Sequence, residues 1–279
     1  MHDEIDPMRV FLTCTLCPGI CISNCPVYTI LRVRSSAPHV IARGGLRLLR
    51  SGDTDRALNL YLCTGCQGCE QACPLDNPLP DAIRRARSRI NKPPKPEAKP
   101  LHVGGMGEER ILLLSPVKPP LGVVEALASR RYSVYWLDST SYTMAYWSGV
   151  EEFIDVEGFN EVVIEDFDAP VKGAALNGLE LIKKAGVGLK RELEEYILHV
   201  PCKARGGTED LAVELLGRPS RVLSTCSGGG GGMLHYMEDY SVEMAGIVAG
   251  SGPVVTLCRW SQLAFEKAGL RAYTVLDLV

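Results

Sequence analysis

The spacing of apolar residues changes near residue 100 of this 279-residue chain. Upstream of that point, apolar side chains recur at the spacing of one face of an amphipathic helix. Residues 81–90 show this pattern, and so do residues 45–62, with a break at Ser51 and Gly52. We therefore predict that the N-terminal part consists mostly of short helices.

Downstream of residue 108 the pattern changes to short apolar runs separated by stretches with helical spacing, such as residues 122–130 and 208–216. The strand-like runs are residues 111–115, 132–137, 161–166, 196–200, 221–225, 254–257 and 273–278. Strands that alternate with helices predict an α/β domain with a largely parallel sheet. The predicted fold class of the whole chain is therefore α + α/β.

Between the two parts lies the segment NKPPKPEAKP, residues 91–100, which contains four prolines and three lysines. Proline lacks a backbone N–H and has a fixed φ, so this segment is predicted to be an extended linker. We expect a helical domain at 1–91, a linker at 92–108 and an α/β domain at 109–279, the last with two repeats at 110–190 and 191–279.

The composition is that of a soluble globular protein, with 46% hydrophobic and 23% charged residues. No apolar run approaches the roughly 20 residues that span a bilayer, and the start, MHDEIDPMRV, lacks the apolar core of a secretory signal. We expect a cytoplasmic protein, or one held at the membrane periphery through a partner. In a reducing compartment its 11 cysteines are expected to bind metal and not to form disulfides.

Eight of the cysteines form two motifs that both end in Cys-Pro. The second, CTGCQGCEQACP, has the C-x2-C-x2-C-x3-C-P spacing of two-cluster ferredoxins, and the first, CTLCPGICISNCP, has one extra residue between its second and third cysteines. In such motifs three close cysteines bind one 4Fe-4S cluster and the fourth binds the neighbouring cluster. We therefore assign the first cluster to Cys14, Cys17, Cys21 and Cys73, and the second to Cys63, Cys66, Cys69 and Cys25.

Zinc is the alternative metal, because paired C-x2-C units also bind zinc. Zinc sites combine two close cysteines with two distant ones, however, whereas residues 63–73 alone hold four. The charge also agrees with clusters. Residues 1–100 carry 14 Lys and Arg against 9 Asp and Glu, and two oxidised clusters with their thiolates bring about four negative charges. This positive excess needs no nucleic acid to explain it.

The two motifs, the helical stretch between them and the arginine-rich helix after YLCTGCQGCEQACP resemble the α-helical ferredoxin domain of the C/D-type iron–sulfur proteins of heterodisulfide reductase. They are similar also to the iron–sulfur subunit of anaerobic glycerol-3-phosphate dehydrogenase. The resemblance covers residues 12–90. It implies an all-helical domain with two 4Fe-4S clusters that serves as an electron-transfer subunit.

Beyond the linker the chain resembles the cysteine-rich CCG repeats of the same family, which hold iron–sulfur clusters at which thiol or disulfide chemistry occurs. HVPCKARG matches their isolated cysteine with Cys202. TCSGGGGG matches Cys-Cys-Gly with Cys226, where Thr225 replaces the first cysteine. VTLCRWS matches Cys-x2-Cys with Cys258, where Ser261 replaces the second. The resemblance therefore implies two degenerate repeats, the upstream copy being free of cysteine.

Cys202, Cys226 and Cys258 each follow a strand-like run, so a parallel sheet would bring them to one edge. They could hold a third iron–sulfur or zinc centre, with His199 or His235 as a further ligand. They could instead form a redox-active thiol pair, or pack as buried thiols, the interpretation that we favour.

Three other features have simpler expectations. The glycines after Cys226 would let backbone approach a buried group, or would direct N–H groups to an anion at a helix that begins near Met233. The acidic EDFD, residues 165–168, is expected in a solvated loop. A solvated helix face, or else a docking face for an acidic partner, is expected for Arg84, Arg85, Arg87 and Arg89.

The chain has no flavin or nicotinamide fingerprint, so two adjacent clusters predict a relay between partners. We expect a non-catalytic electron-transfer subunit of an oxidoreductase, with no membrane span of its own. By resemblance, its partners would be a flavoprotein dehydrogenase and a membrane cytochrome, quinone or disulfide-reducing subunit. The alternatives are a thiol/disulfide reductase that acts at the three C-terminal cysteines, and a structural protein whose fold is stabilised by its clusters.

Overall fold

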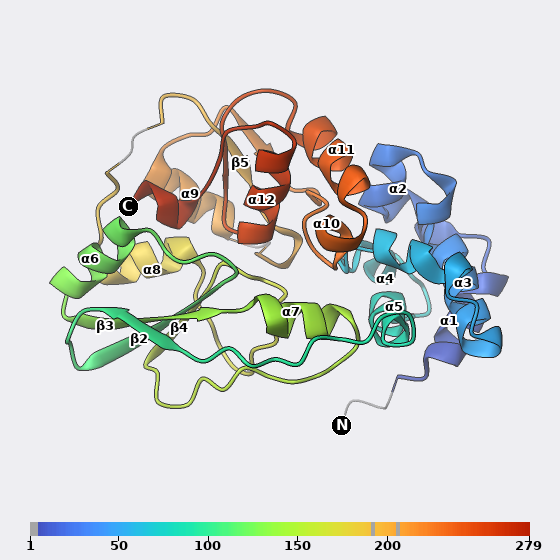
Figure 1. Cartoon of the computed structure of the whole chain (residues 1–279). Helices are drawn as coiled ribbons and strands as arrows, with labels where there is room; N and C mark the ends of the chain where they lie inside the picture. The colour runs from blue at the N-terminus through green and yellow to red at the C-terminus, as the bar shows by residue number, and fades with distance from the viewer. Residues whose placement is uncertain (1–4, 191–192, 205–206) are drawn as a thin grey trace. The chain divides into compact units, whose positions relative to one another are not determined.

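A computed structural model of the chain describes residues 5–190, 193–204 and 207–279 (Figure 1). It divides into two compact units. Unit 1 comprises Met1–Pro94, Met144–Glu151 and Cys226–Val248, and unit 2 comprises Lys95–Thr143, Glu152–Thr225 and Ala249–Val279. The first boundary lies within the proline-rich segment. The two later segments of unit 1 come from the C-terminal part of the chain and could not be assigned from composition.

Unit 1 consists of helices and loops in the part that the structure describes. Its α-helices are α1 (Pro7–Leu16), α2 (Pro26–Leu31), α3 (Pro38–Ser51), α4 (Gly68–Gln71), α5 (Leu79–Arg87), α10 (Met233–Tyr236), the end of α7 (Thr140–Trp147) and most of α11 (Glu238–Ala249). Short 3-10 helices cover Ile20–Asn24, Arg34–Ser36 and Asp55–Leu62. Helices α1, α3 and α5 pack side by side (Figure 1).

The local sequence explains these helices. Proline occupies the first turn of α1, α2, α3 and α5, where its missing N–H has no helical partner to lose. Helix α3 ends at Gly52, whose φ of 70° suits glycine, so the predicted break is confirmed. The apolar faces meet in a buried core that includes Phe11, Ile41, Leu60 and Ile83.

In the residues that the structure describes, unit 2 contains two four-stranded sheets. The first, in the order β1-β3-β2-β4, is formed by β1 (Leu101–Gly104), β2 (Glu109–Ser115), β3 (Tyr132–Asp138) and β4 (Glu161–Ile164). The second, in the order β6-β5-β7-β8, is formed by β5 (Ile197–His199), β6 (Arg221–Leu223), β7 (Val254–Thr256) and β8 (Ala272–Thr274). All pairs are parallel except β1 with β3. The mixed and parallel sheets agree with the coarse class α + α/β.

Strand β1 lies inside the segment interpreted as linker. It is an exposed edge strand of four residues, so it carries no clear apolar alternation. Further along, the helices of unit 2 include α6 (Leu121–Ser129), α8 (Gly178–Ala185), α9 (Thr208–Leu216) and α12 (Arg259–Lys267). Among the described residues, none of the helices combines the length and the apolar character that a membrane crossing requires.

The two sheets share the order of three parallel strands. In each, the first parallel strand lies between the second and the third, as β3-β2-β4 and β6-β5-β7, whereas the fourth strand is placed differently. One continuous core joins both sheets and includes Ile111, Leu198 and Leu179. A duplicated domain would have this order, and the duplication itself stays a prediction.

Candidate iron–sulfur centres

Four cysteines from both motifs line one small cavity in unit 1. Cys25 comes from the first motif, and Cys63, Cys66 and Cys69 come from the second. The rest of the lining is mostly apolar and includes Val27, Pro38, Ile41, Leu79, Pro80 and Ile83. Thiolates in an apolar shell are a donor set for soft metals, so these residues fit an iron–sulfur cluster.

The local backbone positions these four thiols. Cys25 caps the N-terminus of α2, and the N–H of Tyr28 is directed at its sulfur. A thiolate is stabilised at such a helix end. The motifs touch at Gly68, where a Cβ would lie 2.6 Å from the Asn24 carbonyl oxygen. Glycine at this position therefore allows Cys25 to approach the second motif.

The other four motif cysteines surround the end of α1. Cys14 lies in the last turn of α1, Cys17 caps it, Cys21 lies in the next 3-10 helix and Cys73 follows α4. Asn77 donates a hydrogen bond to the Cys14 sulfur at 3.0 Å. The sequence analysis missed Asn77; the one hint was an amide four residues after Cys73. All eight motif cysteines are free thiols.

Electrostatic interactions connect thiols of the two motifs. Burial raises the pKa of Cys14 to about 11; Asn77 opposes the rise, and charge on Cys21, Cys73 and Cys17 adds to it. The Cys73 contribution links the end of the second motif to the first. The Cys14 thiol is therefore neutral at pH 7 without metal, so cluster binding must release its proton.

The second group behaves alike. Burial raises the pKa of Cys25 to about 12, and Cys63 and Cys66 add to the rise. Burial likewise raises the pKa of Cys69, and charge on Cys63, Cys66, Cys21 and Cys25, in that order, adds to the rise. Cys25 is therefore coupled to the second motif, although it belongs to the first in sequence.

In the described parts of the chain, no three His, Cys, Asp or Glu side chains are placed to hold a single metal ion. A single zinc ion needs four ligands that converge on one point. A 4Fe-4S cluster binds each thiolate at a different iron, so its ligands surround a volume.

The arginines of α5 differ from expectation. Arg84 and Arg87 are buried, with 8% and 2% of their surface exposed, so a solvated face is wrong for both. Arg84 donates to Glu151 at 2.7 Å and lies over the Tyr146 ring. Arg89 is exposed. The helical pattern of residues 81–90 contains no information on distant partners. It therefore could not show that residues 144–151 cover the side of α5 that carries Arg84.

The glycine run, residues 228–232, contacts the second motif. The Cys226 thiol donates to the Thr64 hydroxyl at 3.2 Å, and Thr64 directly follows Cys63. A Cβ on Gly231 would lie 2.6 Å from the Cys63 carbonyl oxygen. Of the two expectations for the run, the close approach of backbone to a buried group is therefore the one observed.

The three C-terminal cysteines fall in different units: Cys226 in unit 1, Cys202 and Cys258 in unit 2. A centre formed by all three stays a prediction. Burial raises the pKa of Cys258 to about 11, against hydrogen bonds from Ser261. Among the proposed further ligands, His235 is exposed on α10.

His199 is buried and bonded through both ring nitrogens. Nδ1 lies 2.9 Å from the Thr256 hydroxyl and Nε2 lies 3.0 Å from the Thr225 carbonyl. A carbonyl only accepts, so Nε2 carries the proton and donates it, and Nδ1 accepts. The ring therefore ties β5 to β7 and to the end of β6.

The EDFD segment is not solvated. Glu165 and Asp166 are buried, with 3% and 0% exposed. Arg259 donates two bonds to Glu165, at 2.9 and 3.0 Å, and two to Asp277, at 2.9 and 3.0 Å. One guanidinium thus binds both carboxylates, each through a single nitrogen, and offsets one of their two negative charges. The sequence analysis missed this network because its partners lie far apart in the chain.

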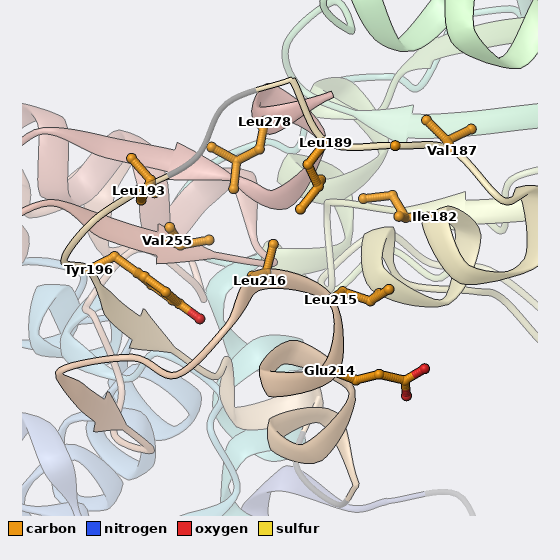
Figure 2. Close-up of a pocket in the computed structure, with 11 residues that line it drawn as sticks. Ile182, Val187, Leu189, Leu193, Tyr196, Glu214, Leu215, Leu216, Val255 and Leu278 are labelled. Atoms are coloured by element: carbon orange, nitrogen blue, oxygen red, sulfur yellow. The ribbon is translucent and has the colours of Figure 1, made fainter.

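Unit 2 also has an apolar cavity of about 510 Å³. Figure 2 shows leucine, isoleucine and valine side chains gathered around it, with Tyr196 and Glu214 also in the lining. Tyr196 donates to the Gly217 carbonyl, and Glu214 pairs with Lys183 at 2.7 Å. The described lining brings together neither a nucleophile and a base nor a set of metal ligands.

Comparison with known proteins supports the two motifs. The family model described as a 4Fe-4S dicluster domain matches residues 11–77, which hold all eight motif cysteines. No curated protein and no solved structure matches the chain. The chain is therefore an iron–sulfur protein with a 4Fe-4S dicluster-type domain, and such a domain supports a role in electron transfer.

Proposed function

We propose that this protein is the iron–sulfur electron-transfer subunit of a multi-subunit oxidoreductase and relays single electrons through two 4Fe-4S clusters. Cys14, Cys17, Cys21 and Cys73 would hold the first cluster, and Cys25, Cys63, Cys66 and Cys69 the second. The observation that carries the proposal is the presence of Cys25 in the cavity of the second motif. Crossed ligation of this kind keeps two clusters adjacent, as a one-electron relay requires.

The clusters, when bound, supply the one-electron chemistry. The chain's own residues hold the thiolates, donate hydrogen bonds to sulfur and exclude water. Asn77 donates to Cys14, and the Gly19 N–H donates to Cys17 at 3.4 Å. Such bonds to sulfur, together with burial, set the reduction potential.

The resemblance of the motifs to heterodisulfide reductase and anaerobic glycerol-3-phosphate dehydrogenase subunits suggests the partners. One would be a flavoprotein dehydrogenase, and the other a quinone, haem or disulfide-reducing subunit. Electrons would be exchanged at the first cluster. Its thiols are bordered by the exposed apolar side chains of Leu16, Ile20 and Leu75, at 78%, 60% and 69% exposure, which suit a redox protein docked beside them.

Elemental analysis of anaerobically purified protein tests the proposal. We expect about eight irons and about eight sulfides per chain, and about two electrons taken up in a coulometric titration. Electron paramagnetic resonance (EPR) of the reduced protein should show two interacting centres. Four irons or fewer, or zinc in place of iron, would overturn the relay. About twelve irons, or a zinc besides eight irons, would instead point to a third centre at Cys202, Cys226 and Cys258.

A further inference from the structure

Arg87 is the most deeply buried of the four arginines around α5 in the part of the chain that the structure describes. Its guanidinium donates to the carbonyl oxygens of Leu60 and Cys63, each at 2.6 Å. It also donates to the carbonyl of Gly231 at 2.5 Å. One side chain therefore ties the loop that presents Cys63 to the glycine run near the other end of the chain.

The charge of Arg87 acts on the thiol that the loop presents. Burial raises the pKa of Cys63, and Arg87 is the largest influence that opposes the rise. The Gly65 N–H acts in the same direction, and Cys66 and Asp81 act against it. Because a guanidinium does not deprotonate in proteins, this positive charge is permanent.

The backbone conformation of the glycine run brings the Gly231 carbonyl oxygen to the Arg87 guanidinium. Gly231 has a φ of 62°, and its Cα faces the Cys63 carbonyl so closely that a side chain would collide with it. On the same segment, the Cys226 thiol donates to Thr64. Two separate contacts thus hold residues 226–232 against residues 63–64.

We propose that Arg87 is a positioning residue that raises the reduction potential of the second cluster, and that residues 226–232 form a cap that Arg87 fastens over the loop of Cys63. The proposal rests on the proposed function, because it concerns the cluster held by Cys25, Cys63, Cys66 and Cys69. Reduction adds one electron to the cluster and makes its charge more negative by one. A fixed positive charge next to Cys63 favours that product, and no proton has to move.

Redox titration of the full chain, with dithionite as reductant and EPR as readout, tests the proposal. In Arg87→Met we expect at least a tenfold fall in the ratio of reduced to oxidised second cluster at a fixed potential, which is 59 mV for one electron. The first cluster should change less than threefold. Cys17→Ser, which removes a ligand of the first group, identifies which EPR signal belongs to which cluster. Arg89→Met removes an exposed charge two residues away and should shift neither cluster tenfold.

An equal shift of both clusters in Arg87→Met, or none, would overturn the proposal. If that variant loses the second cluster, Arg87→Lys decides, because it keeps the charge but cannot bond all the carbonyls. It should retain both clusters, with less than a tenfold fall for the second cluster, because the positive charge stays; a tenfold or larger fall would overturn the proposal, because the charge would then not set the potential. A wild-type protein without two clusters would instead refute the proposed function, so the two failures are distinguishable.

Discussion

Two buried arginines show two ways in which this chain places positive charge in its interior. Arg259 in unit 2 has 4% of its surface exposed, and its guanidinium meets the carboxylates of Glu165 and Asp277. Arg87 in unit 1 has 2% exposed, and its guanidinium meets the backbone carbonyls of the loop that carries Cys63. In unit 2 the guanidinium pairs directly with carboxylate side chains. In unit 1 the arginine lies where a bound cluster would add negative charge.

The comparison explains why the two regions should respond differently to loss of the cofactor. The Arg259 network needs nothing from outside the chain. In unit 1, burial raises the pKa of the Cys14 and Cys25 thiols, which lose their protons only when metal replaces them. Unit 1 is therefore expected to depend on its clusters, and unit 2 to keep its ion network without them.

The largest expected effect is on the ion network. Arg259→Met leaves Glu165 and Asp277 buried without their guanidinium, and breaking such a buried pair costs about 3–5 kcal/mol. Urea denaturation followed by circular dichroism should show this loss, while the cluster potentials stay as in the wild type. Arg271→Met, at an exposed position in unit 2, is the matched control. A loss of stability below about 1 kcal/mol would be typical of an exposed ion pair. It would contradict the comparison of Arg259 with Arg87 as two buried charges.

A pH titration gives a somewhat smaller effect. Burial raises the pKa of Asp166 to about 6, against the hydroxyl groups of Ser139 and Thr143 that donate to it. The folded carboxyl thus holds its proton more tightly than the unfolded one, whose pKa is 3.8. Its stabilisation is fully present below pH 3.8 and is lost as pH rises through about 6. The total is on the order of 3 kcal/mol.

Asp166→Asn removes this titration. Urea denaturation between about pH 4 and pH 7 should show the variant gaining stability relative to the wild type as pH rises, with the gain complete above the folded pKa of about 6. The trend should persist whether or not clusters are bound, because the group belongs to unit 2. Parallel stability curves for the two proteins would show that Asp166 is not the titrating group.

The cap gives a third effect. Gly231→Ala adds a Cβ against the Cys63 carbonyl at a positive φ and should cost about 1–3 kcal/mol, with faster loss of the second cluster in air. Gly52→Ala is the matched control: its φ is 70°, and a Cβ there meets nothing within 4 Å. Bleaching of the iron–sulfur absorbance measures both variants. Equal rates would mean that the glycine run does not protect the cluster.

The smallest effect concerns the first cluster. Asn77→Ala removes the hydrogen bond to the Cys14 sulfur and one to the Val10 carbonyl. N–H bonds to sulfur favour the more negative, reduced state, so the first cluster should become a few-fold harder to reduce. Redox titration should find the second cluster unchanged. A shift confined to the second cluster would contradict the placement of Asn77 beside the first cluster.

The sequence predicted what depends on local spacing. The helical period of unit 1, the parallel strands of unit 2 and the helix end at Gly52 could all be read from neighbouring residues. The contacts of Arg87 with Gly231 and of Arg259 with Glu165 join residues more than 90 positions apart, and no local pattern encodes such pairs. Residues 165–166 were misjudged for the same reason, since their charge was visible and their partner was not.

Crossed ligation is the central claim, and a comparison of four cysteine substitutions tests it directly. Cys25→Ser should alter the same EPR signal as Cys66→Ser, and Cys73→Ser should alter the same signal as Cys17→Ser. Each variant should lose or convert one cluster and leave the other with its wild-type spectrum. If Cys25→Ser instead matches Cys17→Ser, each motif holds its own cluster, and the two groups of thiols are not the ligand sets.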